Sequence, residues 1–167
     1  MKHLGWIFTI ALALFVLWKR IPELSKNISA EGQIFPKLNL AHLDGSPALL
    51  PDSSDEATAV LFWTQTCGPC KFEMERIQRS IDNGRIPANR VVAVHIGGVA
   101  SEVNSHMQKF KFTFNAVIDP EGIASSTLGV TMTPTMYLIS KSGTVAWAST
   151  GIGPTDIFRI ERHFQNN

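Results

Sequence analysis

Residues 57–70 have the sequence ATAVLFWTQTCGPC, an apolar run that leads into two cysteines separated by Gly-Pro. The run Ala57–Trp63 is too short for a typical helix and apolar on both faces, which predicts a central strand of a parallel sheet. Met74, Ile77 and Ile81 follow the cysteines at helical spacing. The sequence therefore predicts a strand, a turn that carries both cysteines, and a helix that packs on the sheet.

Cys67 and Cys70 are the only cysteines in the 167 residues. At a helix start this spacing holds both sulfurs within disulfide reach and places Cys67 at the positive end of the helix dipole. We expect the Cys67 thiolate to attack disulfides and Cys70 to act as the resolving thiol. Half of a zinc site is the alternative, but His42, His95 and His106 lack the spacing of a second ligand pair. A redox-active dithiol is favoured, with no metal and no cofactor.

Composition and charge limit the number of domains and the classes of partner that the chain can have. With 44% hydrophobic and 17% charged residues, the chain has enough material for one globular domain and an accessory segment. A net charge of +1 provides no electrostatic footprint for nucleic acid. No cysteine is left for a structural disulfide, so burial of apolar surface has to hold the core together.

The amino-terminal residues 4–18, LGWIFTIALALFVLW, carry no charge. As a helix they extend roughly 22 Å at 1.5 Å per residue, somewhat less than a hydrocarbon core of about 30 Å. A cleaved signal peptide is the alternative, but Lys19-Arg20-Ile21-Pro22 stands where an Ala-x-Ala-like cleavage site is expected. We therefore expect a transmembrane signal anchor over residues 1–21 and a polar stalk over residues 22–32.

The charges around this segment do not by themselves set its orientation. Lys2 precedes it, whereas Lys19, Arg20 and Lys26 follow it, and this count alone points the next domain toward the cytoplasm. Long domains cross the membrane largely regardless of flanking charge, and a tethered dithiol is most useful on the oxidising side. We predict a single-pass protein of the bacterial inner membrane with its catalytic domain in the periplasm.

The rest of the chain alternates apolar runs with turn residues, which predicts an α/β fold with a mixed sheet flanked by helices. It begins with a hairpin and has a central helix-strand insertion. Strands are expected at residues 38–43, 48–50, 57–63, 91–96, 114–118, 136–139 and 144–147. Helices are expected from the cysteines to Asn83-Gly84, from Ser101 through Phe110, over 123–128, and from Pro154 to Phe164.

Together these motifs resemble the thioredoxin fold. The features that carry the resemblance are Phe62-Trp63 before the cysteine motif, Thr133-Pro134-Thr135 before a strand, and Gly151 before the last helix. Asp44-Gly45, Glu73 and the helix and strand between Ser101 and Ile118 are similar to its membrane-anchored TlpA/ResA branch, which includes thiol-disulfide reductases of cytochrome c maturation. The resemblance covers Gln33 to Phe164 and implies a thioredoxin-like domain over residues 33–167.

The resemblance also implies a substrate-binding surface around the dithiol. Pro134 is expected to be a cis-proline that faces the cysteines, and the Thr133 backbone to pair with an extended substrate segment. Trp63 and Gly151 are the other expected substrate contacts. The alternative for Pro134 is an ordinary trans proline at the start of an edge strand.

Glu73 lies one helical turn beyond Cys70, so its carboxylate can reach the resolving thiol directly or through one water. In the branch that this sequence resembles, a glutamate at this place tunes the dithiol. The alternative is a solvated side chain paired with Arg76, as for most glutamates in helices. Both interpretations stay open at the level of sequence.

Three positions depart from the family pattern. Leu61 stands where a buried acid or an Asn is usual, Thr66 replaces a tryptophan, and Glu75 replaces a helix-kinking proline. These departures leave the substrate preference open. His95, at the carboxyl end of a strand, is more simply a hydrogen-bonded structural residue than a ligand.

The sequence thus predicts a membrane-tethered thiol:disulfide oxidoreductase that reduces protein disulfides and receives electrons from a membrane donor. Gly68-Pro69 is the dipeptide of reducing thioredoxins, which favours the reductive direction. An oxidase or isomerase is the alternative within this class. A redox-inert module that delivers copper or haem through its thiolates is the alternative from another class. A peroxidase is weaker, because a lone peroxidatic cysteine does not need this second cysteine.

Overall fold

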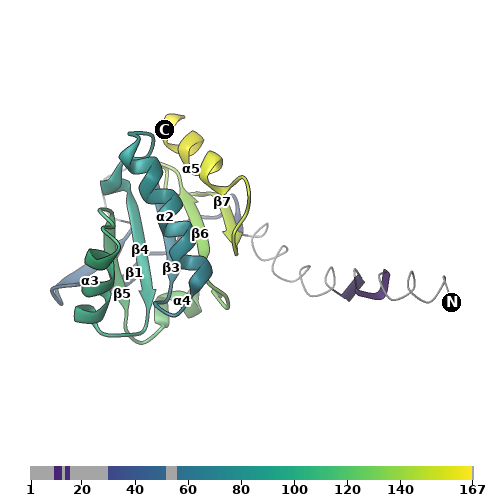
Figure 1. Ribbon diagram of the computed structural model, residues 1–167. Coiled ribbons are helices and arrows are strands. Elements are labelled where there is room, and N and C mark those ends of the chain that lie inside the picture. The colour runs from purple at the N-terminus through teal and green to yellow at the C-terminus, as the bar shows by residue number, and fades with distance from the viewer. Residues whose placement is uncertain (1–9, 13, 16–29, 52–55, 167) are drawn as a thin grey trace.

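The computed structural model describes residues 10–12, 14–15, 30–51 and 56–166. A seven-stranded mixed sheet, with strand order β2-β1-β5-β4-β3-β6-β7, forms the centre of the domain (Figure 1). The strands are β1 (Leu38–His42), β2 (Pro47–Leu50), β3 (Thr58–Trp63), β4 (Val91–Ile96), β5 (Asn115–Asp119), β6 (Thr135–Ile139) and β7 (Val145–Thr150). The helices are α2 (Gly68–Asp82), the 3₁₀ turn η1 (Ala88–Arg90), α3 (Ala100–Lys109), α4 (Ile123–Thr127) and α5 (Asp156–Gln165).

The three central strands are parallel and the outer strands are antiparallel. β3 and β5 both pair with β4 in parallel, while β6, β7 and the β1–β2 hairpin run antiparallel to their neighbours. All six residues of β3 are buried, as expected for a strand covered on both faces. The carboxyl ends of β3 and β4 meet at the pair Trp63 and His95, just before the cysteine motif.

Each face of the sheet has its own apolar core. Residues of α2, α3 and α5 pack on one face, together with alternate residues of β3 such as Leu61. Residues of α4 and the segment before β1 pack on the other face, where Phe35 and Phe62 both contact Tyr137 edge-on. This arrangement fixes α2 against the sheet, so that its first turn lies at the end of β3.

The structure contains the strands and helices that the sequence predicts, with ends that differ by one or two residues, except that β7 continues to Thr150, three residues beyond its expected end. α3 begins at Ala100 rather than Ser101, and Val99 stands at its N-cap without a side-chain hydrogen bond. α5 begins at Asp156 because its first helical hydrogen bond runs from the Arg159 N–H to the Thr155 carbonyl, which leaves Pro154 in the preceding loop. Phe110 lies just beyond the end of α3.

The predicted anchor over residues 1–21 and the stalk over 22–32 lie largely outside the described residues. Within the described part of the chain, no helix is both long and apolar enough to cross a membrane. Residues 10–12 and 14–15 are helical, and Leu14 and Phe15 are exposed. The membrane anchor stays a prediction from the sequence.

The packing of α2 on the sheet leads to a stability test at Ile77, which has no exposed surface. Replacing it by alanine removes buried methylene groups and leaves a cavity, so Ile77→Ala is expected to lower the free energy of unfolding by about 2–5 kcal/mol. Ile123→Ala, the same change at a 62% exposed side chain of α4, is the control and is expected to cost less than about 1 kcal/mol. Urea unfolding followed by circular dichroism measures both. Equal losses for the two variants would contradict this packing.

Candidate active site

Cys67 stands at the N-cap of α2, and Gly68 and Pro69 begin the helix. Cys67 and Cys70 form a disulfide with an S–S distance of 2.02 Å and a Cα–Cα distance of 5.2 Å. The Cys70 backbone N–H donates a hydrogen bond to the Cys67 sulfur at 3.1 Å. This donor and the helix dipole both favour negative charge on that sulfur, so reduction produces a stabilised Cys67 thiolate.

The two sulfurs differ in their access to solvent. Cys70 is completely buried, whereas Cys67 is partly exposed. The Cys67 sulfur lies 3.5 Å from the Thr133 carbonyl oxygen, so the backbone before Pro134 runs directly beside it. Of the two cysteines, only Cys67 is therefore open to solvent, and the roles of attacking and resolving thiol stay a prediction.

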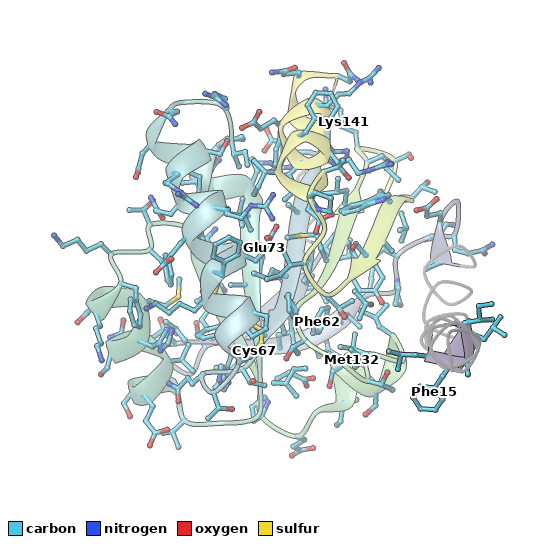
Figure 2. All side chains as sticks on the ribbon, turned by 45° about the vertical axis from the view of Figure 1, so that its right-hand side comes forward. Phe15, Phe62, Cys67, Glu73, Met132 and Lys141 are labelled. Atoms are coloured by element: carbon cyan, nitrogen blue, oxygen red, sulfur yellow. A yellow bond between two sulfur atoms is a disulfide. The ribbon has the colours of Figure 1, made fainter. Side chains whose placement is uncertain are left out.

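The residues expected around the dithiol come together in part. The Thr133–Pro134 peptide bond is cis, and the Gly151 N–H donates to the Pro134 carbonyl at 2.8 Å. Met132 is 49% exposed, and Figure 2 places it toward the Cys67 end of α2. Thr133, Pro134 and Gly151 therefore form a rim of backbone on one side of Cys67.

Trp63 does not belong to this rim. Its side chain is 1% exposed and packs in the core, with its ring edge-on to His95 and beside His106. Such burial leaves it no surface to contact a docked protein, so we do not retain the expected substrate contact at Trp63. Its role in the geometry is to support the loop that carries Cys67.

His95 secures the same loop through both ring nitrogens. The Gln65 backbone N–H donates to Nε2 at 3.2 Å, so the ring proton is on Nδ1, which donates to the Gly97 carbonyl at 2.8 Å. The ring is therefore held between β4 and the turn before Cys67. This is the structural histidine that the sequence favours. Among the described residues, no group of three or more His, Cys, Asp or Glu side chains is placed to hold a metal ion.

Glu73 is buried in α2, with 2% of its surface exposed, so the interpretation as a solvated glutamate is wrong. It is nevertheless paired with Arg76, whose Nη1 donates to Oε2 at 2.8 Å. The other carboxylate oxygen, Oε1, has no hydrogen-bond partner among the described residues. Figure 2 shows Glu73 on α2, above Cys67 along the helix.

The electrostatic surroundings make Glu73 a group that titrates near neutral pH. Burial raises the pKa of its carboxyl from the ordinary 4.5 to about 7, the nearby Arg76 lowers it, and the negative charge of Asp156 raises it. A carboxyl with this pKa holds and releases a proton at the pH where thiol exchange operates. Glu73 lies one helical turn beyond Cys70.

Asp156 was not expected from the sequence. It lies in the first turn of α5 and is 4% exposed, and it accepts a hydrogen bond from the Gly153 N–H at 2.5 Å. Glu73 is the carboxylate that spacing along the sequence places one turn beyond Cys70. An acid in the first turn of a helix is ordinarily a partner of the helix dipole, and nothing local in the sequence relates Asp156 to α2.

The fold and this geometry define a thioredoxin-like thiol-disulfide oxidoreductase: a redox-active Cys-Gly-Pro-Cys disulfide at a helix start beside a cis-proline. The chain belongs to the AhpC/TSA family, whose model matches residues 32–148.

Comparisons with individual proteins agree with this assignment. The chain is 29% identical over 126 residues to the thiol-disulfide oxidoreductase ResA of Geobacillus thermodenitrificans, covering 75% of this chain and 72% of the relative. It is also 29% identical over 158 residues to sporulation thiol-disulfide oxidoreductase A of Bacillus subtilis, covering 92% and 91%. In fold it is similar to a thiol:disulfide interchange protein from Chlorobium tepidum, with a TM-score of 0.64, 21% identity and coverage of 82% and 97%.

The raised pKa of Glu73 predicts how stability depends on pH in the oxidised protein. Folded protein keeps the Glu73 proton up to a pH of about 7, whereas the unfolded chain releases it near 4.5. Stability from this group is therefore fully present below pH 4.5 and is lost as pH rises through 7, by about 3 kcal/mol in total. In Glu73→Gln this loss disappears, so the unfolding free energy of this variant rises relative to that of wild type between these pH values.

Glu75→Gln, a change at an exposed glutamate of the same helix, is the control, and urea unfolding from pH 4 to 8 measures all three proteins. Parallel pH profiles for wild type and Glu73→Gln would contradict the raised pKa.

Proposed function

We propose that the protein reduces disulfide bonds in other proteins, with Cys67 as the attacking thiolate and Cys70 as the resolving thiol. The observation that carries this proposal is the unequal exposure of the two sulfurs at the start of α2. Cys67 meets solvent beside the Thr133 backbone, where an extended substrate segment can pair, while Cys70 is enclosed behind it. Thr133, Pro134 and Gly151 form the proposed substrate contact.

The proposed cycle moves two electrons from the protein dithiol to the substrate. The Cys67 thiolate attacks one substrate sulfur, which forms a mixed disulfide and releases the other substrate sulfur as a thiolate that takes up a proton. Cys70 then gives its proton to the Glu73 carboxylate, and its thiolate attacks the Cys67 sulfur. This step forms the Cys67–Cys70 disulfide and releases the second substrate thiolate. A dithiol donor has to reduce the Cys67–Cys70 disulfide before the next cycle.

The role of Glu73 in this cycle rests on its position and its surroundings. It is buried one turn from Cys70, and its Oε1 has no hydrogen-bond partner among the described residues. A pKa of about 7 lets it accept the Cys70 proton near neutral pH. General acid–base assistance of this kind typically contributes about a hundredfold or more to a rate.

The site of action is part of the same proposal. An anchor over residues 1–21 and a short stalk place the catalytic domain at the outer surface of the inner membrane, with a membrane protein as electron donor. The uncharged stretch 4–18 and the missing cleavage site support the anchor. Relatives named ResA support a function in cytochrome c maturation or in related editing of thiols, through the branch resemblance.

Reduction of insulin in the presence of a dithiol donor tests the direction and the cysteine roles. Wild type is expected to catalyse it, Cys67→Ser to lose all catalysis, and Cys70→Ser to accumulate a mixed disulfide between Cys67 and substrate, visible by non-reducing electrophoresis. Accumulated mixed disulfides in the Cys67→Ser variant, instead of in Cys70→Ser, would reverse the assigned roles. Equal insulin reduction by wild type and by Cys67→Ser, with copper or haem bound stoichiometrically, would instead favour a delivery module.

Fusions of alkaline phosphatase and of green fluorescent protein to the carboxyl terminus test the topology. We expect active phosphatase, no fluorescence, and a fusion protein that sediments with membranes, because residues 1–21 translocate the domain and stay attached. The control is a chain without residues 1–21, which is expected to keep the reporter in the cytoplasm. A fluorescent reporter on the full chain means that Lys19 and Arg20 set the opposite topology, and a soluble periplasmic product means that the segment is cleaved.

A further inference from the structure

Two buried carboxylates lie on the neighbouring helices α2 and α5. Glu73 of α2 is 2% exposed and Asp156 of α5 is 4% exposed, and the two helices contact each other (Figure 1). Burying a carboxylate is costly unless hydrogen bonds or opposite charge compensate it. Arg76 forms an ion pair with Glu73, whereas no ion pair with Asp156 is found within the described part of the chain.

A continuous series of hydrogen bonds joins the two acids. The Arg76 Nη1 donates to Glu73 Oε2 at 2.8 Å and to the Gly153 carbonyl at 3.1 Å. The Gly153 N–H in turn donates to Asp156 Oδ2 at 2.5 Å. One residue of backbone therefore bridges the guanidinium and the Asp156 carboxylate, so that the position of Asp156 determines where Gly153 presents its carbonyl to Arg76.

Residue 153 has to be glycine for this arrangement. A Cβ atom at this position lies 2.2 Å from Asp156 Oδ1, well inside van der Waals contact. The same loop carries Gly151, whose N–H donates to the Pro134 carbonyl. The loop between β7 and α5 thus contacts both the cis-proline beside Cys67 and the guanidinium that pairs with Glu73.

We propose that Asp156 is a positioning residue for proton transfer at Glu73, acting through the Gly153 backbone and the Arg76 guanidinium. This inference rests on the proposed function, in which Glu73 takes the Cys70 proton. Asp156 touches neither the substrate nor the cysteine sulfurs in this role. It holds the loop that keeps Arg76 on one Glu73 oxygen, which leaves Oε1 free to receive the proton.

The charge of Asp156 also sets the pH range in which Glu73 works. The charged groups that act on Glu73 are Arg76 of its own helix, which lowers its pKa, and Asp156 of α5, which raises it, while burial is the largest cause of the raised value. The thiols of Cys67 and Cys70 are the other titratable groups of the site once the disulfide is reduced. Removing the negative charge of Asp156 is therefore expected to let Glu73 lose its proton at lower pH.

Asp156→Asn is the sharpest variant, because its side-chain oxygen can still accept from the Gly153 N–H while its charge is gone. We expect the titration midpoint of the Glu73 carboxyl to fall by about one pH unit, as like-charge repulsion within a buried pair predicts. Carbon-13 NMR of glutamate side-chain carboxyls in the oxidised full chain measures this midpoint, and Glu73→Gln identifies the resonance. Asp156→Ser, which also offers a neutral acceptor, gives the same shift and serves if the Asn variant does not fold.

The rate at which Cys70 resolves the mixed disulfide is a second readout, which would not change with pH in this way if Asp156 had only a structural role. Below its midpoint the deprotonated fraction of Glu73 changes tenfold for each pH unit. With the midpoint lowered from about 7 to about 6, about half of Glu73 is deprotonated at pH 6 instead of about a tenth. Resolution of the mixed disulfide in Asp156→Asn is therefore expected to be about fivefold faster than in wild type at pH 6 and nearly unchanged at pH 8. Glu75→Gln removes a negative charge from the outer side of α2, where Glu75 pairs with Lys71, and is expected to change neither readout.

These outcomes separate this inference from the proposed function. An unchanged Glu73 midpoint in both neutral Asp156 variants overturns the action of the Asp156 charge on Glu73, whatever the enzyme reduces, because the titration needs no turnover. Wild-type resolution rates for Glu73→Gln at pH 6 overturn the proposed role of Glu73, even where the midpoint shifts as expected. A lower Glu73 midpoint together with faster resolution at pH 6 in Asp156→Asn supports both the role of Asp156 and the role of Glu73.

Discussion

Packing of one face of α2 on the sheet determines where the reactive groups lie. Met74 and Ile77 have no exposed surface, and a helix repeats every 3.6 residues, so side chains three or four positions earlier share their face. Cys70 and Glu73 are those side chains. The apolar contact that places the start of α2 at Cys67 therefore also buries the Cys70 sulfur and a carboxylate one turn beyond it.

Burial of a carboxylate sets a limit on this arrangement. An ionised Glu73 without hydrogen bonds or opposite charge around it is strongly unfavourable in the interior. A Glu73 carboxylate with both oxygens fully paired would not hold a proton at neutral pH. Arg76 supplies one hydrogen bond, and the second oxygen stays without a partner among the described residues, which leaves the pKa at about 7. Stability is thus lost at the pH where the proposed chemistry gains a base, as is common at functional sites.

The sequence predicts the parts of this site that depend on local pattern. The apolar run before Cys67, the spacing to Cys70 and the resemblance that includes Pro134 lead to the correct order of strands and helices. Whether Glu73 is buried cannot be decided this way, because its position at the edge of the apolar stripe suits a surface salt bridge equally well. The surroundings of Asp156 are even harder to predict from the sequence, because its contact with Gly153 and its effect on Glu73 exist only once α5 packs beside α2.

Because β3 has Leu61 below the dithiol, the buried carboxylate near the cysteines comes from helix α2 and not from the strand. This position of β3 has no exposed surface and lies in the same core cluster as Cys70, so the strand offers no carboxylate beneath the dithiol. The acid comes instead from α2, and its surroundings come from the loop and first turn of α5. Under the proposed function, substitutions around Gly153 and Asp156 change the pH dependence of thiol exchange while the cysteine motif stays the same. The proposed tuning residues are thus separate in sequence from the two cysteines.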